Sequence, residues 1–440
     1  MFTRKEFDQR TFEYELAGRK LVVETGKMCG LSNGSCLVRY GDTVVLVNAT
    51  ASEKPRDGID FFPLSVDYEE KLYSVGHIPG SFQRREGRPG DKAILVSRVI
   101  DRPIRPLFPK DMRNDVSIVC TVMSVEQDNS PEICAMIGTS IALSISDIPW
   151  AGPIGGLQIG YVDGKLVINP TEKERAESTL ALTVAASKKK VVMIEAGANE
   201  IPDEVMFDAI MLAHETIKPL CDFIEGIANE IGKPKFNYTE INVPEELFNR
   251  IKDNYIEDMR RVMDTDDKNV RDAGVAELTD RIHADLDEEF EEFQPMFGEC
   301  IYKLQKYVVR RWLLDDNKRV DGRAMNEVRP LAAEVGILPR VHGSGMFTRG
   351  QTQVLTTCTL GTVADYQLLD GISPETEKRY MHHYNFPGYS VGEAKPIRSP
   401  GRREIGHGAL AERALEPVIP SETEFPYCLR LVSEVLSSNG

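Results

Sequence analysis

Residues 34–50 have the sequence GSCLVRYGDTVVLVNAT, in which two apolar and β-branched runs are separated by Gly41-Asp42. Glycine beside aspartate is typical of a turn, so the segment predicts two consecutive strands. The second run, residues 43–50, is apolar at nearly every position, which favours a strand covered on both faces. We therefore expect this second strand to be buried inside the protein.

A related segment follows 309 residues later. Residues 343–359 have the sequence GSGMFTRGQTQVLTTCT, which is identical to the first segment at seven of 17 positions. Pro79-Gly80 also matches Pro387-Gly388, at an offset of 308. A nearly constant offset between matching segments indicates a duplicated domain.

The end of the duplication marks how much of the second copy is present. Asn129 matches Asn439 at an offset of 310, each after an apolar strand. The first copy continues well beyond Asn129, whereas Asn439 is followed only by Gly440. We therefore expect the second copy to comprise only the N-terminal half of the duplicated core.

The rest of the sequence divides into a strand-rich part and a helical part. Apolar runs predict further strands at residues 21–24, 117–126, 180–186 and 190–195. Helical spacing predicts helices at residues 91–101, 133–145 and 203–226, the first with Asp91 as its N-cap and Pro103 at its end. Residues 243–316 carry almost no strand signal and are predicted to be helical, with an acidic amphipathic helix over 284–293.

These patterns predict an α/β (α+β) fold in three parts. Residues 1–235 form the first core, residues 243–316 form an all-helical linker domain, and residues 320–440 form the N-terminal half of a second core. A length of 440 residues agrees with a multidomain chain.

Composition limits the classes of function. The net charge of −16 excludes a protein that binds nucleic acid or anionic membranes through its overall charge, although it leaves room for a local basic site. No apolar run approaches the length of a membrane span, and the first eight residues contain no hydrophobic stretch of a secretory signal. The eight scattered cysteines show no C-x-x-C spacing, which favours buried, reduced thiols in a cytoplasmic protein.

The densest basic cluster lies at residues 81–89, in a segment framed by glycine and proline, and is followed by Arg98, Arg102 and Arg105. Its candidate RNA-binding residues are Phe82, Arg84, Arg85, Arg88, Arg98, Arg102 and Arg105. An aromatic ring beside two arginines in a loop suits single-stranded nucleic acid, because the ring stacks on a base and the guanidinium groups hold phosphates. The alternative is a surface loop whose arginines pair with nearby carboxylates.

A second basic cluster lies at residues 399–413. Arg403 and His407 are four residues apart and share a helix face if a helix begins here. Arg402 and Arg403 near a helix N-terminus would form an anion site, and a capped helix with solvated arginines is the alternative. Neither a P-loop nor a metalloprotease H-E-x-x-H motif occurs.

Long strings in these segments resemble the polynucleotide phosphorylase family. They are IPGSFQRREGRP (78–89), DRPIRPLFP (101–109), VDGR (320–323), EVRP (327–330), HYNFP (383–387), YSVGE (389–393) and RREIGHG (402–408). The resemblance covers the whole chain and implies two RNase PH-like cores that flank an all-α domain.

The resemblance also implies an activity. Members of this family are ring-shaped homotrimers that thread single-stranded RNA through a central channel and degrade it from 3′ to 5′, with inorganic phosphate as co-substrate and Mg²⁺ as cofactor. The family pattern places Phe82, Arg84 and Arg85 in the channel loop, and Arg402, Arg403 and His407 on the phosphate and RNA side of the active site. Attachment to an RNA-degradation complex is a further implied partnership, and no membrane is involved.

The sequence departs from the family pattern at three places. Gln83 stands where the channel loop usually has a second aromatic residue. The serine-rich phosphate turn and the aspartates that hold the metal are expected beyond Gly440, so no metal ligands are predicted in this chain, and the C-terminal KH and OB-fold modules are also expected there. The 440-residue chain alone is therefore predicted to be inactive.

Two other interpretations remain open. A catalytically inactive RNA-binding or scaffold fragment of the same family would keep the loop and lack the chemistry. A tRNA-trimming enzyme of the RNase PH type would share the core, but the duplicated core and the helical insert argue against it.

Overall fold

The computed structural model describes residues 8–59, 61–238 and 243–438. The chain forms two compact units. The first comprises Met1–Thr239, Cys358–Asn385 and Arg398–Ser433, and the second comprises Glu240–Thr357, Phe386–Ile397 and Glu434–Gly440.

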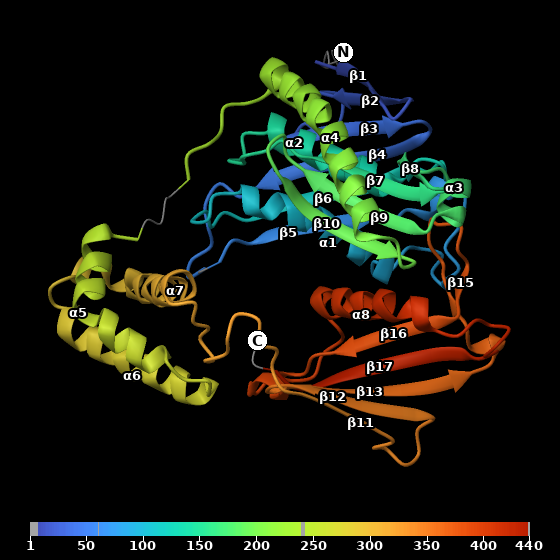
Figure 1. The fold of residues 1–440 in the computed structure, drawn as a ribbon. Coiled ribbons are helices and arrows are strands. Elements are labelled where there is room, and N and C mark those ends of the chain that lie inside the picture. The colour runs from blue at the N-terminus through green and yellow to red at the C-terminus, as the bar shows by residue number, and fades with distance from the viewer. Residues whose placement is uncertain (1–7, 60, 239–242, 439–440) are drawn as a thin grey trace. The chain divides into compact units, whose positions relative to one another are not determined.

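The first sheet is built around the predicted pair of strands. Its six strands lie in the order β1 (Arg10–Leu16), β2 (Arg19–Thr25), β3 (Gly34–Tyr40), β4 (Thr43–Ala51), β6 (Val116–Ser124) and β5 (Leu64–Glu69) (Figure 1). β3 pairs with β4 in antiparallel register from Gly34 opposite Ala49 to Tyr40 opposite Thr43, whereas β5 runs parallel to β6. Val45, Val47 and Ala49, on one face of β4, are fully buried, whereas Leu46 and Asn48 on the other face are only partly buried. The prediction of a covered strand is therefore confirmed for one face only.

Helix α2 (Pro131–Ile145) packs against β3 and β4, and nearly all its residues are buried. Glycines permit this close approach. A Cβ at Gly34 would lie 2.1 Å from the carbonyl oxygen of Ala142, and a Cβ at Gly138 would lie 2.6 Å from Cγ2 of Val47. Real side chains cannot pack at such distances, so glycine is required where the helix meets the sheet.

A second, four-stranded sheet completes the first core, and α4 (Asp203–Ile231) lies across it (Figure 1). Its strands lie in the order β10 (Val191–Ala198), β9 (Leu180–Ala186), β7 (Gly155–Val162) and β8 (Lys165–Ile168), with α3 (Glu172–Glu177) after β8. Buried residues of both sheets and of α2 and α4 form one continuous apolar cluster.

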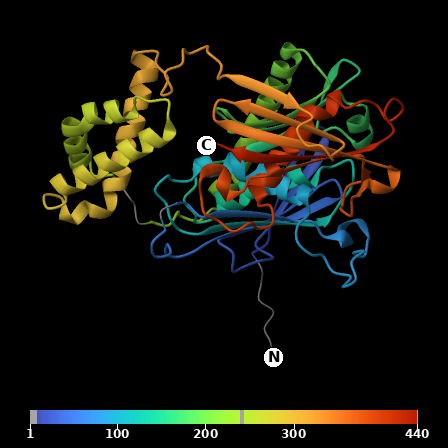
Figure 2. The ribbon, with the colours of Figure 1, turned by 90° about the horizontal axis from the view of Figure 1, so that it is seen from below.

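The duplicated segment forms a sheet with the same strand order. Its strands are β11 (Leu331–Val335), β12 (Gly343–Arg349), β13 (Thr352–Gly361), β17 (Cys428–Ser437) and β16 (Tyr380–Asn385), shown in orange and red in Figure 2. This order reproduces β2-β3-β4-β6-β5 of the first sheet. Two short strands, β14 (Gln367–Leu368) and β15 (Glu377–Lys378), pair with each other in the segment between β13 and β16.

The structure corrects one part of the sequence alignment. The 3₁₀ turn η1 (Leu72–Val75) ends at Gly76 with φ of 73°, and η5 (Gly388–Val391) ends at Gly392 with φ of 76°. Tyr-Ser-Val-Gly occurs at both ends, at an offset of 316, so the match of Pro79-Gly80 to Pro387-Gly388 is wrong. The segment between β13 and β16 is longer than the equivalent segment between β4 and β5, so the offset between the two copies rises from 309 to 316 here. The match to Asn439 lies outside the described residues.

The helical part contains α5 (Glu245–Met263), α6 (Lys268–Leu286) and α7 (Phe297–Asp315), which share their own apolar cluster. The acidic segment 284–293 is not one helix. α6 ends at Leu286, and a separate 3₁₀ turn, η3, spans Glu291–Met296. Phe290 interrupts the segment with a non-helical backbone, with φ of −123° and ψ of 41°, while Leu286 and Phe290 both pack in the apolar cluster.

Other helix ends also differ from the predictions. Gly90, and not Asp91, is the N-cap of α1 (Asp91–Ile104), and Pro103 lies inside the helix. Pro103 costs one backbone hydrogen bond near the helix end, but Pro103 and Ile104 are buried in the core. The chain then tightens into the 3₁₀ turn η2 (Arg105–Leu107). α4 continues past residue 226 to Ile231.

All eight cysteines are free, and six are buried, whereas Cys29 and Cys358 are only partly buried. Among the described residues, no helix has both the length and the apolar character needed to cross a membrane.

Candidate functional site

The loop at residues 78–89 exposes its aromatic ring and its arginines. The Phe82 side chain has a relative exposure of 101%, so none of the described residues covers it. Arg84, Arg85 and Arg88 are exposed, and none of them forms an ion pair with a described carboxylate. The structure therefore does not support the alternative in which these arginines are paired.

The loop nevertheless has a defined backbone. Arg84 adopts a left-handed conformation with φ of 51°, and its amide donates to the Ser81 carbonyl at 2.9 Å. The Ser81 hydroxyl donates to the Arg85 carbonyl at 3.1 Å. The Glu86 carboxylate accepts from the Leu72 amide at 3.1 Å, and backbone hydrogen bonds lower the pKa of Glu86. The loop is thus anchored to η1 while its cationic side chains face solvent.

Arg98 lies on α1 and contacts α8 (Arg402–Leu415), the helix that carries the second basic cluster. A Cβ at Gly406 would lie 2.5 Å from Nε of Arg98. A side chain at this point of α8 would displace the guanidinium group from its position. The duplication thus brings an arginine of the first copy beside the predicted site residues of the second.

His407 lies next to Arg98 and Arg403. Burial lowers the pKa of His407 from its ordinary value of 6.5, and the charges of Arg403 and Arg98 lower it further. The His407 ring packs edge-on against Tyr384 of β16, with ring centroids 5.0 Å apart. The imidazole is therefore neutral at pH 7, and the positive charge of the site resides in the two guanidinium groups.

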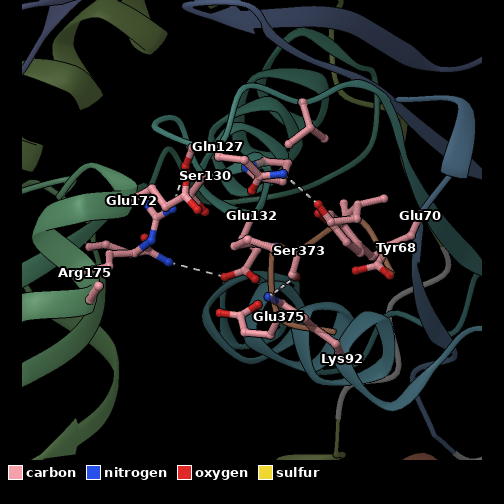
Figure 3. A pocket seen from close by; sticks show the side chains of 16 residues that line it. Tyr68, Glu70, Lys92, Gln127, Ser130, Glu132, Glu172, Arg175, Ser373 and Glu375 are labelled. Carbon is pink, nitrogen blue, oxygen red and sulfur yellow. Dashed lines mark hydrogen bonds between the residues drawn. The ribbon is translucent and has the colours of Figure 1, made fainter. Parts of the chain in front are cut away.

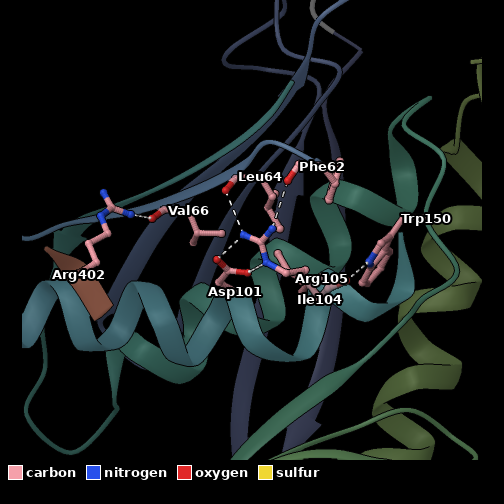
Figure 4. A network of polar contacts seen from close by, with 8 residues as sticks. All are labelled: Phe62, Leu64, Val66, Asp101, Ile104, Arg105, Trp150 and Arg402. Carbon is pink, nitrogen blue, oxygen red and sulfur yellow. Dashed lines mark hydrogen bonds and ion pairs between the residues drawn. The ribbon is translucent and has the colours of Figure 1, made fainter. Parts of the chain in front are cut away.

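The Arg402 side chain contacts β5 of the first sheet and not the surroundings of His407. Its guanidinium donates to the Val66 carbonyl at 2.6 Å (Figure 4). It also forms an ion pair with Asp67, the next residue of β5. The N-terminus of α8 is thereby attached to the first sheet. Of the two adjacent arginines, Arg403 remains without a described ion pair, and Arg402 is engaged by the protein itself.

Arg102 is also engaged by the protein. Its guanidinium pairs with Oε2 of Glu195 on β10 at 2.8 Å, and Arg413 of α8 pairs with Oε1 of the same carboxylate at 3.0 Å. Arg102 and Arg413 occupy equivalent positions on α1 and α8, each three residues before a 3₁₀ turn. One carboxylate thus holds the two duplicated helices together.

Among the seven candidate RNA-binding residues, Arg105 makes the most hydrogen bonds within the protein (Figure 4). Its guanidinium makes two 2.7 Å hydrogen bonds to Asp101 and donates to the carbonyls of Phe62 and Leu64 at 3.4 and 3.1 Å. A fork with both branches on one carboxylate is a strong and oriented contact. This pattern is typical of an arginine that supports the fold.

A cavity of about 410 Å³ lies between the first sheet and residues 372–375 (Figure 3). Gln127 donates to the Ile372 carbonyl at 3.0 Å, and Lys92 contacts the Ser373 hydroxyl. Burial raises the pKa of Glu70 in this cavity, and Lys92 opposes that shift. None of the predicted site residues lines it.

The arrangement of the His, Cys, Asp and Glu side chains bears on metal binding. Within residues 8–59, 61–238 and 243–438, no group of three or more His, Cys, Asp or Glu side chains is arranged to hold a metal ion. His382 and His383 of β16 do not form such a group, since His382 contacts the Ser433 hydroxyl at 2.8 Å and His383 accepts from Arg430 at 3.2 Å.

Sequence patterns missed two contributors to the site. Tyr384 packs on His407, and Glu195 connects α1 to α8. An alignment of β5 with β16 at an offset of 316 would have placed Tyr384 opposite Tyr68 as an equivalent core position. Glu195 carries no local signal, because its partners are 93 and 218 residues away.

We expect inorganic phosphate to raise the pKa of His407, because an anion held by Arg98 and Arg403 would offset their charge. Without phosphate, the folded-state pKa lies below 6.5, so this group contributes stability that is full above pH 6.5 and is lost as the pH falls through the folded pKa. An NMR pH titration of the imidazole resonance, with and without phosphate, measures the shift. An unchanged His407 midpoint at high phosphate would contradict an anion site between Arg98 and Arg403.

The chain matches three family profiles. Residues 17–149 and 327–440 match domain 1 of the 3′ exoribonuclease family, and residues 152–216 match domain 2 of that family. Residues 246–324 match the domain described as "Polyribonucleotide nucleotidyltransferase, RNA binding domain". The two matches to domain 1 coincide with the duplicated sheets.

Curated relatives agree with these profiles. The polyribonucleotide nucleotidyltransferase of Ruminiclostridium cellulolyticum is 64% identical over 98% of this chain and 61% of that protein. That of Caldicellulosiruptor saccharolyticus is 58% identical over 98% of this chain and 62% of that protein. That of Clostridioides difficile is 55% identical over 99% of this chain and 62% of that protein. Among solved structures, rice (Oryza sativa) Rrp46 aligns with a TM-score of 0.39 and 15% identity, over 51% of this chain and 96% of that one.

The chain spans about three-fifths of the length of these relatives. Its duplicated sheet order, its intervening helical domain and its matched segments agree with one another. The chain belongs to the 3′ exoribonuclease family, and within that family to the polyribonucleotide nucleotidyltransferases, or polynucleotide phosphorylases.

Proposed function

We propose that this protein takes part in 3′-to-5′ phosphorolysis of single-stranded RNA, which releases nucleoside diphosphates and runs in reverse as polymerisation. The proposal rests on one observation: the guanidinium groups of Arg98 and Arg403 both lie beside neutral His407. The exposed loop with Phe82, Arg84 and Arg85 supports the RNA part of the proposal.

The chemistry requires two anions to meet. A phosphate oxygen attacks the terminal phosphodiester, a new P–O bond forms, and the bond to the 3′ oxygen of the preceding nucleotide breaks. That oxygen takes up a proton as it leaves. Fixed guanidinium groups reduce the repulsion between the anions and stabilise the charge that develops in the transition state. Arg403 is proposed to hold phosphate, and Arg98 and His407 to orient it.

Three expected RNA contacts are revised in this proposal. The guanidinium groups of Arg102 and Arg105 form ion pairs with Glu195 and Asp101, and that of Arg402 forms an ion pair with Asp67. We propose that these three arginines position α1 and α8. RNA contact is assigned to Phe82, Arg84, Arg85 and Arg88 of the loop. Mg²⁺ remains the expected cofactor of the family, and no step is assigned to it here.

The family resemblance supports further proposals about partners. We propose a cytoplasmic homotrimer that binds RNA in a central channel and can associate with an RNA-degradation complex. The second candidate function, an RNA-binding scaffold without catalysis, rests on the same exposed loop. Phosphate-dependent release of nucleoside diphosphates distinguishes the two functions.

Arg84→Ala combined with Arg85→Ala is expected to weaken binding of single-stranded RNA about tenfold or more at low salt, because two phosphate contacts are lost. The slope of log affinity against log salt should fall by about 1.4, at about 0.7 per contact on single strands. Fluorescence anisotropy with a labelled oligoadenylate measures both quantities.

Arg260→Ala combined with Arg261→Ala is the matched control. It removes the same charge, but these arginines already pair with Glu257 and Asp258. We expect wild-type RNA affinity from it. Equal affinity of the loop variant and the wild type would refute the RNA assignment of the loop.

A further inference from the structure

Glu195 of β10 is shared by the two helices that carry the candidate anion site. Its Oε2 accepts from Nη1 of Arg102 on α1 at 2.8 Å, and its Oε1 accepts from Nη2 of Arg413 on α8 at 3.0 Å. Among the described residues, neither guanidinium group has another carboxylate partner. Loss of this one carboxylate would therefore break both ion pairs at once.

The backbone of β10 also contributes to this bridge. Gly197 lies two residues after Glu195, on the same face of the strand, and a Cβ there would lie 3.2 Å from Cδ of Arg413. The Ile194 carbonyl accepts from Nη2 of Arg102 at 3.4 Å. The side chains of Glu195 and Arg413 are only 21% and 29% exposed. Solvent and salt therefore screen this bridge less than a fully exposed ion pair.

Helical spacing connects the bridge to the candidate anion site. Arg98 and Arg102 are four residues apart and share a face of α1. Gly406 and Arg413 are seven residues apart, about two turns, and share a face of α8. The two helices thus meet at two places, where Arg98 lies against Gly406 and where both helices bind Glu195. Two separate contacts fix the orientation of one helix on the other, whereas a single contact would leave a pivot.

The Glu195 carboxylate also offsets a repulsion. The guanidinium groups of Arg102 and Arg413 bind the two oxygens of one carboxylate, so their positive charges lie close together. Like charges at such a separation repel each other, and partial burial weakens the screening between them. Removal of the carboxylate would therefore drive α1 and α8 apart, and Arg98 would move away from Gly406.

We propose that Glu195 is a positioning residue for the candidate anion site, because it holds α1 against α8. It thereby keeps Arg98 and Arg403 beside His407, while it contacts neither the phosphate nor the RNA itself. The proposal rests on the proposed function in one respect, which is that inorganic phosphate is the anion bound at this site.

The test is an NMR pH titration of His407 in the full chain, with and without inorganic phosphate, for the wild type and Glu195→Gln. Burial, Arg403 and Arg98 together lower the pKa of His407, and the variant withdraws Arg98. We therefore expect the phosphate-free midpoint to rise towards 6.5. The dissociation constant of phosphate should rise about tenfold or more, as for the loss of one charge-assisted hydrogen bond.

Two further variants separate positioning from general stability. Glu195→Asp keeps the charge and should retain most of the phosphate affinity. Arg413→Gln added to Glu195→Gln removes the repulsion, so the His407 midpoint and the phosphate affinity should partly recover. A purely structural role would lower the melting temperature of the variants without moving the His407 midpoint of the folded protein.

Asp115→Asn is the matched control. It also removes one negative charge and breaks an ion pair, the contact with Arg56 at 2.8 Å, which involves neither α1 nor α8. We expect the wild-type His407 midpoint and the wild-type phosphate affinity from it.

The outcomes separate this proposal from the proposed function. If phosphate shifts the wild-type His407 midpoint, and Glu195→Gln gives the same midpoints and affinity, only the positioning role is refuted. If phosphate leaves the wild-type midpoint unchanged, the phosphate site of the proposed function fails. The phosphate-free titration then still decides the role of Glu195, because a raised midpoint in Glu195→Gln supports it and an unchanged midpoint refutes it.

Discussion

Arg403→Ala is expected to lower the rate of phosphate-dependent nucleoside diphosphate release about 10²- to 10³-fold in a catalytically competent protein that contains these residues. The variant removes one of the two guanidinium groups beside His407 and leaves the neutral imidazole without its strongest neighbouring charge. The Michaelis constant for phosphate should rise more than that for RNA, since the loop residues remain in place. Initial rates at varied phosphate concentrations measure this difference.

Arg403→Lys separates charge from geometry. Lysine keeps the positive charge but cannot offer two parallel donors to one phosphate, so we expect partial recovery of activity. Arg261→Ala is the control with the same change in charge at a distant, paired position, and it should leave the rate unchanged. A rate near wild type for Arg403→Ala would show that phosphate binds elsewhere.

Gly34→Ala is expected to destabilise the first core by about 3 kcal/mol or more, because overpacking of a tight core usually costs about 1–3 kcal/mol and here the obstacle is backbone. The new Cβ would lie 2.1 Å from the Ala142 carbonyl oxygen. β3 or the C-terminal end of α2 must therefore move. Chemical denaturation followed by fluorescence, together with differential scanning calorimetry, measures the change in stability.

Gly30→Ala is the matched control for this substitution. A Cβ at Gly30 meets no atom within 4 Å, and its φ lies outside the left-handed region. We expect a change within about 0.5 kcal/mol, as for most surface substitutions. Equal stability of the two variants would contradict the close packing of α2 on β3.

The local sequence pattern predicted the main helices and strands of this fold correctly. The runs at residues 34–50 and 343–359 are both observed as adjacent strands, and the helical character of residues 243–316 is confirmed by α5, α6 and α7. Both signals depend on residues close together in sequence, where side-chain periodicity directly reports the backbone. The boundaries of α1 and of segment 284–293 depended on burial instead, and there the predictions were wrong.

The local sequence pattern was less informative about the candidate site, where it did not show which arginines form ion pairs. Arg402 and Arg403 are adjacent and chemically identical, yet one is tied to Asp67, 335 residues away, and the other is not. Arg102 and Arg105 belong to the same basic cluster as Arg84 and Arg85, but they pair with Glu195 and Asp101. Asp101, four residues before Arg105, is a local signal for that pair, but no neighbouring residue marks Arg102 or Arg402 as paired.

The sequence by itself determined that the chain holds a duplicated strand pattern around a helical domain, and that arginines gather in two motifs. Only the tertiary structure decided which arginines remain free for an anion. The physical reason is that an ion pair neutralises a guanidinium group only within about 4 Å. Folding brings distant carboxylates to that distance from Arg102 and Arg402, while Asp101 lies one helical turn before Arg105 and Gly406 admits Arg98 beside His407.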